Sequence, residues 1–448
     1  MLVVRSTRVV LPGREQAAAI HVDHGRIVRV APPDDVPAGA EVFDAGRLVV
    51  SPGIVDTHVH VNEPGRTEWE GFDTATRAAA AGGVTTVVDM PLNSVPATTT
   101  VAALQEKRHA AVGQCHVDVA FWGGIVPRNE GHLDALVEAG ARGFKCFLVP
   151  SGVEEFQPVD ESDLRRAMPM VARRSVPLLV HAESPGIVTR AFQAREHARD
   201  PERVALRYST YLATRPPEAE LEAVRLMIRL AAEFGTRVHI VHVAAAEAVD
   251  EIARAKARGV SVTAETCPHY LTFSADDIAD GATVFKCAPP IRQPSHREAL
   301  WDGLRRGTLD LVATDHSPSP PALKCGLDFL SAWGGIASLE LSLAATWTAA
   351  HSRGVSPIDL AGWMSGAPAT LAGLEASKGA IAEGRDADLV VWDPDVEIIV
   401  DPSRLQQRHK LSPYAGRRLR GVVHSTLVRG VRVWDDGQLV RPNGGRLI

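Results

Sequence analysis

Cysteine is scarce in this sequence, and its spacing pairs no cysteine with another. The chain of 448 residues has five, at positions 115, 146, 267, 287 and 325. The number is odd, the positions lie far apart, and no Cys-x-x-Cys pair occurs. The pattern therefore favours neither a disulfide framework nor a zinc site built from thiolates, and we expect a reduced, cytoplasmic protein.

An excess of one charge and long apolar runs are also missing. The 48 Lys and Arg residues nearly balance the 54 Asp and Glu residues, and the formal net charge is −6. A nucleic-acid or membrane surface would need a basic stretch or face, so neither partner is expected. No apolar stretch is long enough to span a bilayer, and Arg5, Arg8 and Arg14 interrupt the apolar runs of the N-terminus, so no signal peptide is predicted.

The sequence does contain enough apolar material for a large core, arranged differently at the ends and in the middle. Hydrophobic residues make up 45% of the chain. Residues 1–50 and 376–448 show short strand patterns separated by turns, and we expect them to form one small β-sandwich domain beside a central domain. Residues 51–375 alternate strand and helix patterns instead. The strand patterns, of which the first begins just before this range, lie at 48–55, 85–89, 117–122, 143–148, 177–180, 237–243, 261–264 and 309–313.

The alternation in the middle of the chain predicts an α/β fold. About eight strand–helix units suit a (β/α)8 barrel of the TIM type, whose active site lies at the C-terminal ends of the strands. The helix patterns lie at 72–81, 218–234, 244–258 and 297–306. A doubly wound sheet is the structural alternative, but its Gly-x-Gly-x-x-Gly fingerprint is missing after the strand patterns.

A pair of histidines stands at the end of the first strand pattern, in Asp56-Thr-His-Val-His60. Side chains alternate between the faces of a strand, so His58 and His60 project to the same side, where they can bind a metal ion such as zinc. Alone, a His-x-His pair is weak evidence. Four further residues of ligand type follow, each at the end of its own strand pattern: Lys145, His181, His242 and Asp315.

Taken one at a time, these residues have ordinary structural explanations. Lys145 can be an edge residue that reaches water, a histidine can belong to the core, and Asp315 can cap a helix. His239 and His242 are expected on opposite faces of one strand, so only one can face the barrel interior, and we choose His242 because it lies nearer the C-terminal end. Together on successive strand ends of one barrel, the six residues predict a metal centre.

The expected chemistry explains why these residue types occur. Burial disfavours the charge of a lysine, and a neutral amine can add carbon dioxide to give an anionic carbamate that bridges two metals. Two bridged cations can hold a hydroxide at neutral pH and polarise the carbonyl under attack. Asp315 would take the proton of that hydroxide and return it to the leaving nitrogen. Nitrogen and oxygen ligands suit zinc, cobalt or manganese.

These residues resemble the metal site of the binuclear cyclic amidohydrolases in the amidohydrolase superfamily, and the similarity covers nearly the whole chain. Within that superfamily, the segments at 58–66, 90–94, 144–148, 286–292, 315–318 and 332–336 are most similar to the allantoinase family. The resemblance implies two divalent ions, zinc foremost, bridged by a carboxylated Lys145. It also implies the ring opening of allantoin to allantoate in purine (ureide) catabolism, and a homotetramer.

The resemblance further implies substrate contacts at Asn62, Asn93, Ala288 and Gly334. Dihydroorotases carry an arginine where this chain has Asn62, which suits a neutral ureide better than a carboxylate, although Arg66 lies nearby. Dihydropyrimidinases and hydantoinases, the alternative enzymes, have a tyrosine shortly after the bridging lysine, where this chain has Leu-Val-Pro at 148–150. They also carry serine and asparagine in place of Ala288 and Gly334.

An alternative of a different class is a non-catalytic scaffold similar to dihydropyrimidinase. It is disfavoured because all six ligand positions are present. His269 and His316 are expected either to support the site or to be structural.

Overall fold

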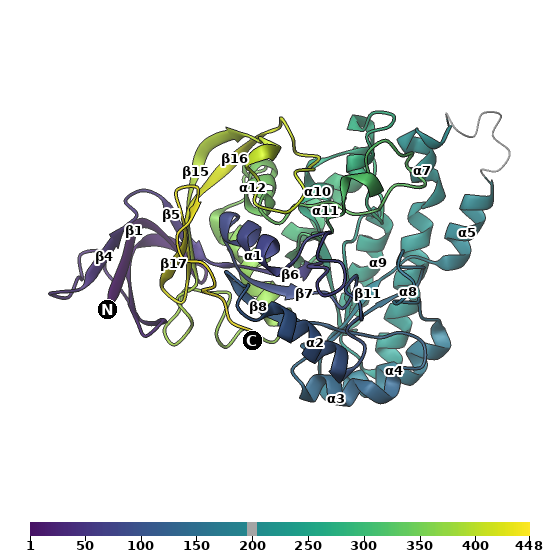
Figure 1. The fold of residues 1–448 in the computed structure, drawn as a ribbon, viewed down its shortest axis with the longest axis horizontal. Helices are drawn as coiled ribbons and strands as arrows, with labels where there is room; N and C mark the ends of the chain where they lie inside the picture. Colours follow the sequence, from purple (N-terminus) through teal and green to yellow (C-terminus); the bar gives the residue numbers. More distant parts are fainter. Residues whose placement is uncertain (195–203) are drawn as a thin grey trace.

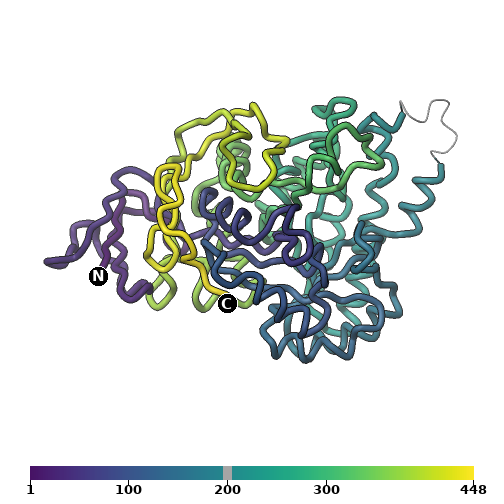
Figure 2. Tube along the Cα trace, in the orientation of Figure 1, coloured from purple at the N-terminus to yellow at the C-terminus, as the bar shows by residue number. Residues whose placement is uncertain are grey.

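The computed structural model describes residues 1–194 and 204–448, and Figure 1 shows two parts. The purple and yellow ends of the chain meet in a sheet on one side, and the strands and helices of the middle of the chain lie on the other. Figure 2 shows the N-terminus at the sheet and the C-terminus closer to the middle part. There the amide of Ile448 donates to the carbonyl of Val119 at 2.9 Å, so the end of the chain is tied to a strand of the middle.

The terminal sheet takes strands from both ends of the sequence. Their order is β18-β17-β16-β15-β5-β1-β2-β3, and β4 pairs with β1. The bounds are β1 Leu2–Leu11, β2 Arg14–Asp23, β3 Arg26–Ala31, β4 Glu41–Asp44, β5 Val49–Pro52, β15 Leu389–Ile399, β16 Arg418–Val428, β17 Val431–Asp435 and β18 Gln438–Leu439. β5 joins the two ends because it pairs with both β1 and β15.

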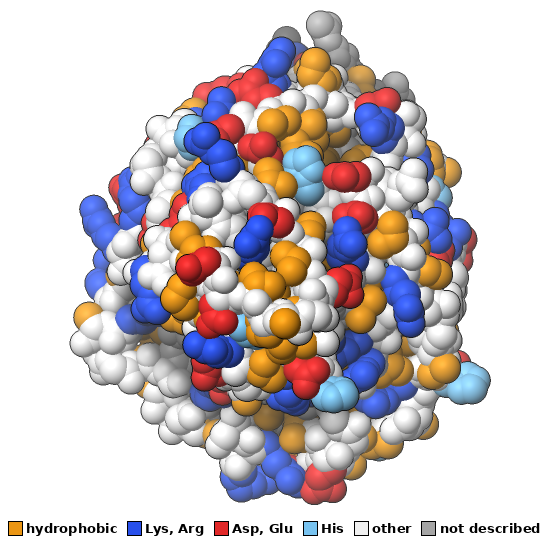
Figure 3. Space-filling view, turned by 90° about the vertical axis from the view of Figure 1, so that its left-hand side faces the viewer, with side chains coloured by type: hydrophobic (Ala, Val, Ile, Leu, Met, Phe, Trp, Pro, Cys, Tyr) orange, Lys and Arg blue, Asp and Glu red, His pale blue; other side chains and the backbone are white. Residues whose placement is uncertain are grey.

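An apolar cluster of its own stabilises this sheet. Val4, Ile20, Leu389 and Leu427 are completely buried members of it. On the outer face, shown in Figure 3, side chains of both charges are interspersed with apolar ones. The small β domain predicted from both termini is therefore confirmed, while the boundaries predicted at 50/51 and 375/376 stay predictions.

Parallel strands of the middle form a closed barrel. They are β6 Ile54–Val59, β7 Val84–Asp89, β8 Asp118–Phe121, β9 Gly123–Gly124, β10 Phe144–Phe147, β11 Leu178–His181, β12 Val238–Ile240, β13 Val262–Thr266 and β14 Leu311–Val312. β8 and β9 lie on either side of Trp122 and together occupy one strand position of the barrel, so the described residues give eight strand positions. The barrel closes where His60 N donates to His316 O at 2.8 Å and His316 N donates to His58 O at 3.2 Å. The predicted (β/α)8 barrel is confirmed.

Helices cover the outside of the barrel. Their bounds are α1 Phe72–Ala81, α2 Val101–Ala111, α3 Leu133–Glu138, α4 Glu161–Arg174, α5 Pro185–Ala194, α7 Tyr208–Thr214, α8 Pro217–Phe234, α9 Ala246–Ala257, α10 Pro268–Thr272, α11 Pro294–Arg305, α12 Ser342–His351, α13 Pro357–Ala361 and α14 Ala367–Leu371. The sequence of α8 shows why a helix forms at this place. It has Pro217 in its first turn and the left-handed Gly235 at its end, and it buries an apolar stripe that includes Met227 and Ala231. No helix in the described ranges is long and apolar enough to cross a membrane.

The pattern at 48–55 predicts one strand, and that prediction is wrong. The chain breaks at Gly53, so β5 belongs to the terminal sheet and β6 to the barrel. Glycine is required at this break, because a Cβ at position 53 would lie 2.2 Å from Oγ1 of Thr85. Apolar residues continue across the break because both short strands are buried, which is why the pattern alone could not separate them.

Candidate metal centre

Five of the six predicted ligands lie at or just beyond the C-terminal ends of barrel strands, and Lys145 lies within the four-residue strand β10. All six are buried. The ligands and their positions are His58 in β6, His60 just after it, Lys145 in β10, His181 at the end of β11, His242 beyond β12 and Asp315 beyond β14. The barrel thus brings together residues that are separated by more than two hundred positions in the sequence.

Three of them converge most closely. One ligand atom each from His58, His242 and Asp315 lie within 4.8 Å of one another, which is a group that could hold a metal ion. Oδ1 of Asp315 lies 3.1 Å from Nε2 of His58 and 3.4 Å from Nε2 of His60. Burial alone would raise the pKa of Asp315, but the surrounding histidines lower it well below its usual value. The carboxylate is therefore held in its charged form, as a metal ligand or a base must be.

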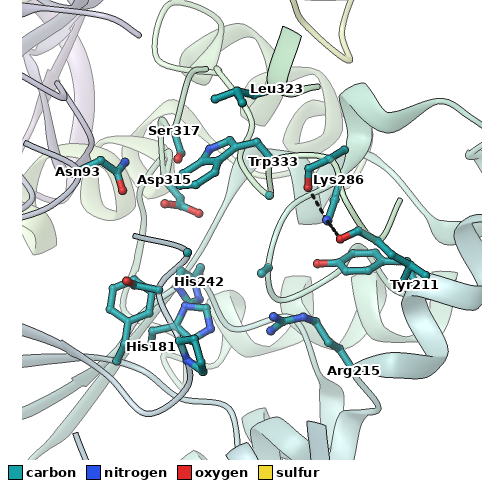
Figure 4. A pocket seen from close by; sticks show the side chains of 18 of the residues that line it. Asn93, His181, Tyr211, Arg215, His242, Lys286, Asp315, Ser317, Leu323 and Trp333 are labelled. Carbon is teal, nitrogen blue, oxygen red and sulfur yellow. Dashed lines mark hydrogen bonds between the residues drawn. The ribbon is translucent and has the colours of Figure 1, made fainter. Parts of the chain in front are cut away.

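His181 extends this group. Its ring centroid lies 4.6 Å from that of His242, and Figure 4 shows the two side chains next to each other at one side of the cavity. The ring stacks on Phe147 at 4.7 Å, and its Nε2 donates to Oε2 of Glu183 at 2.7 Å. A carboxylate on one ring nitrogen fixes the tautomer and leaves Nδ1 unprotonated, which is the form that binds a metal.

Lys145 is completely buried, so the prediction that it could be an edge residue reaching water is excluded. No described residue accepts a hydrogen bond from its Nζ. The ring of Phe147 lies beside it, with its centroid 5.0 Å from Nζ. Burial lowers the pKa of Lys145 to about 8, against the opposing effect of Asp315 and Glu265. An orphaned nitrogen among metal-ligand side chains fits an amine modified to a bridging group better than a free ammonium.

A buried carboxylate that the sequence analysis missed supports the first histidine. Glu265, in β13, accepts from Nδ1 of His58 at 2.5 Å and from Nε2 of His239 at 3.0 Å. Burial would raise the pKa of Glu265, but the two histidines lower it to about 2. The available signal was a charged residue directly after the strand pattern at 261–264.

The expectation that only one of His239 and His242 can face the barrel interior is wrong. His239 contacts Glu265, which contacts His58 on a non-neighbouring strand, so His239 also points inward. Alternation fails because β12 already ends at Ile240 and His242 has a left-handed backbone with φ of 42°. Asp315 has a φ of 46°. Such conformations are strained for residues with a side chain and tend to occur at functional sites.

A cavity of about 410 Å³ opens beside these side chains. Asn93, Ala288 and Gly334, three of the four residues predicted to contact substrate, line it. A Cβ at Gly334 would lie 3.9 Å from the Cβ of Ala288, so the two form one patch of wall.

Asn62, the fourth predicted contact, is not among the lining residues. It is completely buried, and its Oδ1 accepts from Nδ2 of Asn93 at 2.9 Å. The structure thus places Asn62 behind Asn93. Arg66 is not a lining residue either, because its guanidinium binds Glu155 and the carbonyl of Asn93.

The sequence analysis assigned no contact to the other residues of the cavity, although Lys286 and Trp333 lie in the segments 286–292 and 332–336 that carry the resemblance. Tyr211, Arg215 and Lys286 line it, and Figure 4 shows them opposite the histidines. Arg215 follows the short helix α7, where no periodicity predicts the direction of a side chain. Trp333 also lines the cavity and contacts Trp69 edge to face, with centroids 4.8 Å apart.

His269 and His316 are both buried near the centre without lining the cavity. Nδ1 of His316 accepts from the amides of Ser338 and Leu339 at 3.2 and 3.3 Å. This contact fixes the segment after Asp315. No hydrogen bond to either ring nitrogen of His269 is made by the described residues.

Comparisons with known proteins agree with this geometry. The model of the amidohydrolase family matches residues 49–433. The allantoinase of Streptomyces avermitilis is 51% identical over 99% of this chain and 97% of its own length, and that of Arabidopsis thaliana is 43% identical over 97% and 88%. An L-hydantoinase (dihydropyrimidinase) from Arthrobacter aurescens superposes with a TM-score of 0.95 at 30% identity, covering 100% of this chain and 99% of that one. The chain belongs to the amidohydrolase family, and within it to the group that contains these allantoinases.

Proposed function

We propose that this protein is an allantoinase, a hydrolase that opens the ring of allantoin to give allantoate. The observation that carries the proposal is the convergence of six ligand-type side chains beside a cavity, in a chain 51% identical to an allantoinase along nearly its whole length. This arrangement suits the hydrolysis of carbon–nitrogen bonds in cyclic amides. The resemblance assigns the reaction to purine catabolism, and the expected location is the cytoplasm.

We infer that the centre holds two divalent cations, with zinc as the first candidate and cobalt or manganese as the others. Lys145, His58, His60, His181, His242 and Asp315 would hold them. When bound, the cations supply a hydroxide at neutral pH and polarise the carbonyl under attack. The orphaned Nζ of Lys145 supports carboxylation of this residue, because a carbamate would replace a costly buried ammonium by an anion with two ligand oxygens.

In the proposed mechanism the protein moves one proton. Asp315 accepts it at a carboxylate oxygen as the nucleophile attacks, and donates it to the ring nitrogen that leaves. The amide nitrogen leaves poorly without that proton. The lowered pKa of Asp315 keeps its carboxylate ionised before the reaction. Glu265 and Glu183 stay ionised and orient His58 and His181 throughout.

The proposed ring contacts are Asn93 and the backbone at Ala288 and Gly334. Asn62 is proposed to act through Asn93, because its amide oxygen accepts from the Asn93 side chain. An amide both donates and accepts hydrogen bonds, which suits a neutral ring with alternating N–H and C=O groups.

A dihydropyrimidinase or hydantoinase is the second candidate, because the structural relative named above bears that title. The sequence favours allantoin, since identity to the allantoinases is higher and the tyrosine expected after the bridging lysine is missing at 148–150. The two candidates are separated by measuring kcat/KM of the metal-reconstituted enzyme for allantoin, dihydrouracil, hydantoin and dihydroorotate. A higher kcat/KM for dihydrouracil or hydantoin than for allantoin would overturn the substrate assignment and leave the amidohydrolase class intact.

A homotetramer is proposed from the resemblance. Apolar side chains exposed on the terminal sheet, such as Val42, Val396 and Ile399, offer surface for such an association. Light scattering of the purified protein tests the assembly. Metal analysis of the same sample tests the remaining alternative, a scaffold without catalysis, which would bind no stoichiometric metal.

A further inference from the structure

The wall of the cavity opposite the histidines is made of polar groups that the proposed mechanism does not use. Figure 4 shows Tyr211 and Arg215 pointing from this wall into the cavity, toward His181 and His242. A substrate ring held at the metal ligands would direct any further arm toward this wall. The donors and acceptors of the wall therefore decide which arms fit.

Arg215 offers hydrogen-bond donors to the cavity. Its side chain is 20% exposed, and its single hydrogen bond to a described residue goes from Nη1 to Oε2 of Glu183. A guanidinium has five N–H groups in a planar fork, so several remain for a ligand. Because the completely buried Glu183 balances its charge, Arg215 does not require an anionic partner.

Tyr211 offers an acceptor beside these donors. Its hydroxyl donates to the carbonyl of Cys287 at 2.7 Å, which leaves the lone pairs of the oxygen free to accept. Burial raises the pKa of Tyr211 above its usual value, so the phenol keeps its proton.

Lys286, the third polar member of the wall, is used differently. Its Nζ lies 5.1 Å from the centroid of the Tyr211 ring and donates to the carbonyls of Leu330 and Ala332, as the dashed lines in Figure 4 indicate. Lys286 thus fixes the loop that carries Ala332, Trp333 and Gly334.

We propose that Arg215 and Tyr211 form a subsite for a ureido arm on the substrate. The guanidinium donates a pair of hydrogen bonds to the urea carbonyl of the arm, and the Tyr211 oxygen accepts one from an arm N–H. The subsite rests on the proposed function and assigns these two residues to the ureido arm, the part of allantoin that hydantoin lacks. Selectivity follows because a ligand without the arm leaves the remaining N–H groups of Arg215 and the acceptor lone pairs of Tyr211 without a ligand partner.

The test compares allantoin with hydantoin, which has the same ring and no arm. Hydantoin is measured as a substrate or, where its turnover is too slow, by its inhibition constant against allantoin hydrolysis. Arg215→Lys keeps a charge for Glu183 but loses the fork. We expect kcat/KM for allantoin to fall by about tenfold or more while the value for hydantoin changes much less. Tyr211→Phe should shift the same ratio in the same direction by a smaller factor.

Two control variants separate this role from general damage. Glu265→Gln disturbs His58 rather than the partner of Arg215, and below saturating metal it should lower kcat/KM for both ligands by the same factor. Lys286→Met loosens the loop that carries Ala332, Trp333 and Gly334, and it should likewise lower kcat/KM for both ligands. Metal content is measured for every variant, so that loss of the centre is recognised.

Equal losses for allantoin and hydantoin in both Arg215→Lys and Tyr211→Phe would overturn the subsite. The wild-type substrate panel tests the proposed function by itself. A wild-type preference for allantoin combined with an unchanged ratio in both variants therefore rejects the subsite alone. A wild-type preference for hydantoin rejects the proposed function.

Discussion

Replacing Glu265 by glutamine tests the support of the metal centre most directly. The carboxylate is completely buried and accepts from Nδ1 of His58 and from Nε2 of His239. A glutamine has nearly the same shape, but only its oxygen can accept and its NH2 group must donate. If the NH2 group faces His58, the proton of that imidazole moves to Nε2, the nitrogen that faces Asp315, and the histidine binds a metal more weakly.

The size of the effect follows from the lost hydrogen bond. A hydrogen bond to a charged group contributes roughly 1.5–3 kcal/mol, and about 1.4 kcal/mol corresponds to a factor of ten in a binding constant. Glu265→Gln should therefore weaken metal binding by about ten- to a hundredfold, which agrees with the usual cost of losing the hydrogen-bond partner of a metal-bound histidine. Activity at saturating metal should be largely recovered.

The assay is titration of the metal-free protein with zinc in a chelator buffer, followed by activity at each free zinc concentration. Thr263→Val is the matched control, because Oγ1 of Thr263 lies 2.8 Å from the other ring nitrogen of His239 and leaves the Glu265–His58 contact in place. It should change the zinc affinity by less than about threefold. An unchanged affinity in Glu265→Gln would refute the reasoning, since His58 would then be oriented without its carboxylate.

Three further substitutions test other parts of the structure. Lys145→Ala should lose metal and activity together, with partial recovery on adding short-chain carboxylic acids, and intact metal stoichiometry by mass spectrometry would contradict the bridging role. Asp315→Asn should lower kcat by at least about a hundredfold with unchanged circular dichroism; near-normal kcat with both metals bound would show that another group transfers the proton. Lys107→Met leaves Asp89, its buried partner at 2.6 Å, unpaired, and should cost about 3–5 kcal/mol in urea unfolding. The more exposed Lys256, paired with Asp310, gives the control variant Lys256→Met, expected to cost less than about 1 kcal/mol.

The barrel could be predicted from the sequence because its evidence is local. Each strand and helix repeats a pattern within its own window, and short loops leave few ways of joining them. The ends of strands were less certain, as the pattern at 237–243 and the three-residue β12 show. A buried strand and the buried loop after it are equally apolar, so hydrophobicity does not mark the point where pairing stops.

The partners of the metal ligands could not be predicted, because they are far away in the sequence. Glu265 is separated from His58 by 207 positions, and the contact exists only once the barrel has closed. Glu183, two residues after His181, was within reach of local reasoning. Its role was hidden because a carboxylate after a strand is usually a solvated loop residue.

The pairing of the arginines near the cavity bears on the charge of the substrate. Dihydroorotate carries a carboxylate, which needs an arginine free to bind it. Arg66 is bound to Glu155 and Arg215 to Glu183, so each already has a carboxylate partner. Lys286 lines the cavity without one, but its ammonium donates to backbone carbonyls, and burial lowers its pKa to about 8. A neutral ureide needs no counter-charge from these groups. The carboxylate of dihydroorotate would have to compete with Glu155 or Glu183 for an arginine. This competition disfavours dihydroorotate, although the barrel and its metal ligands would suit either ring.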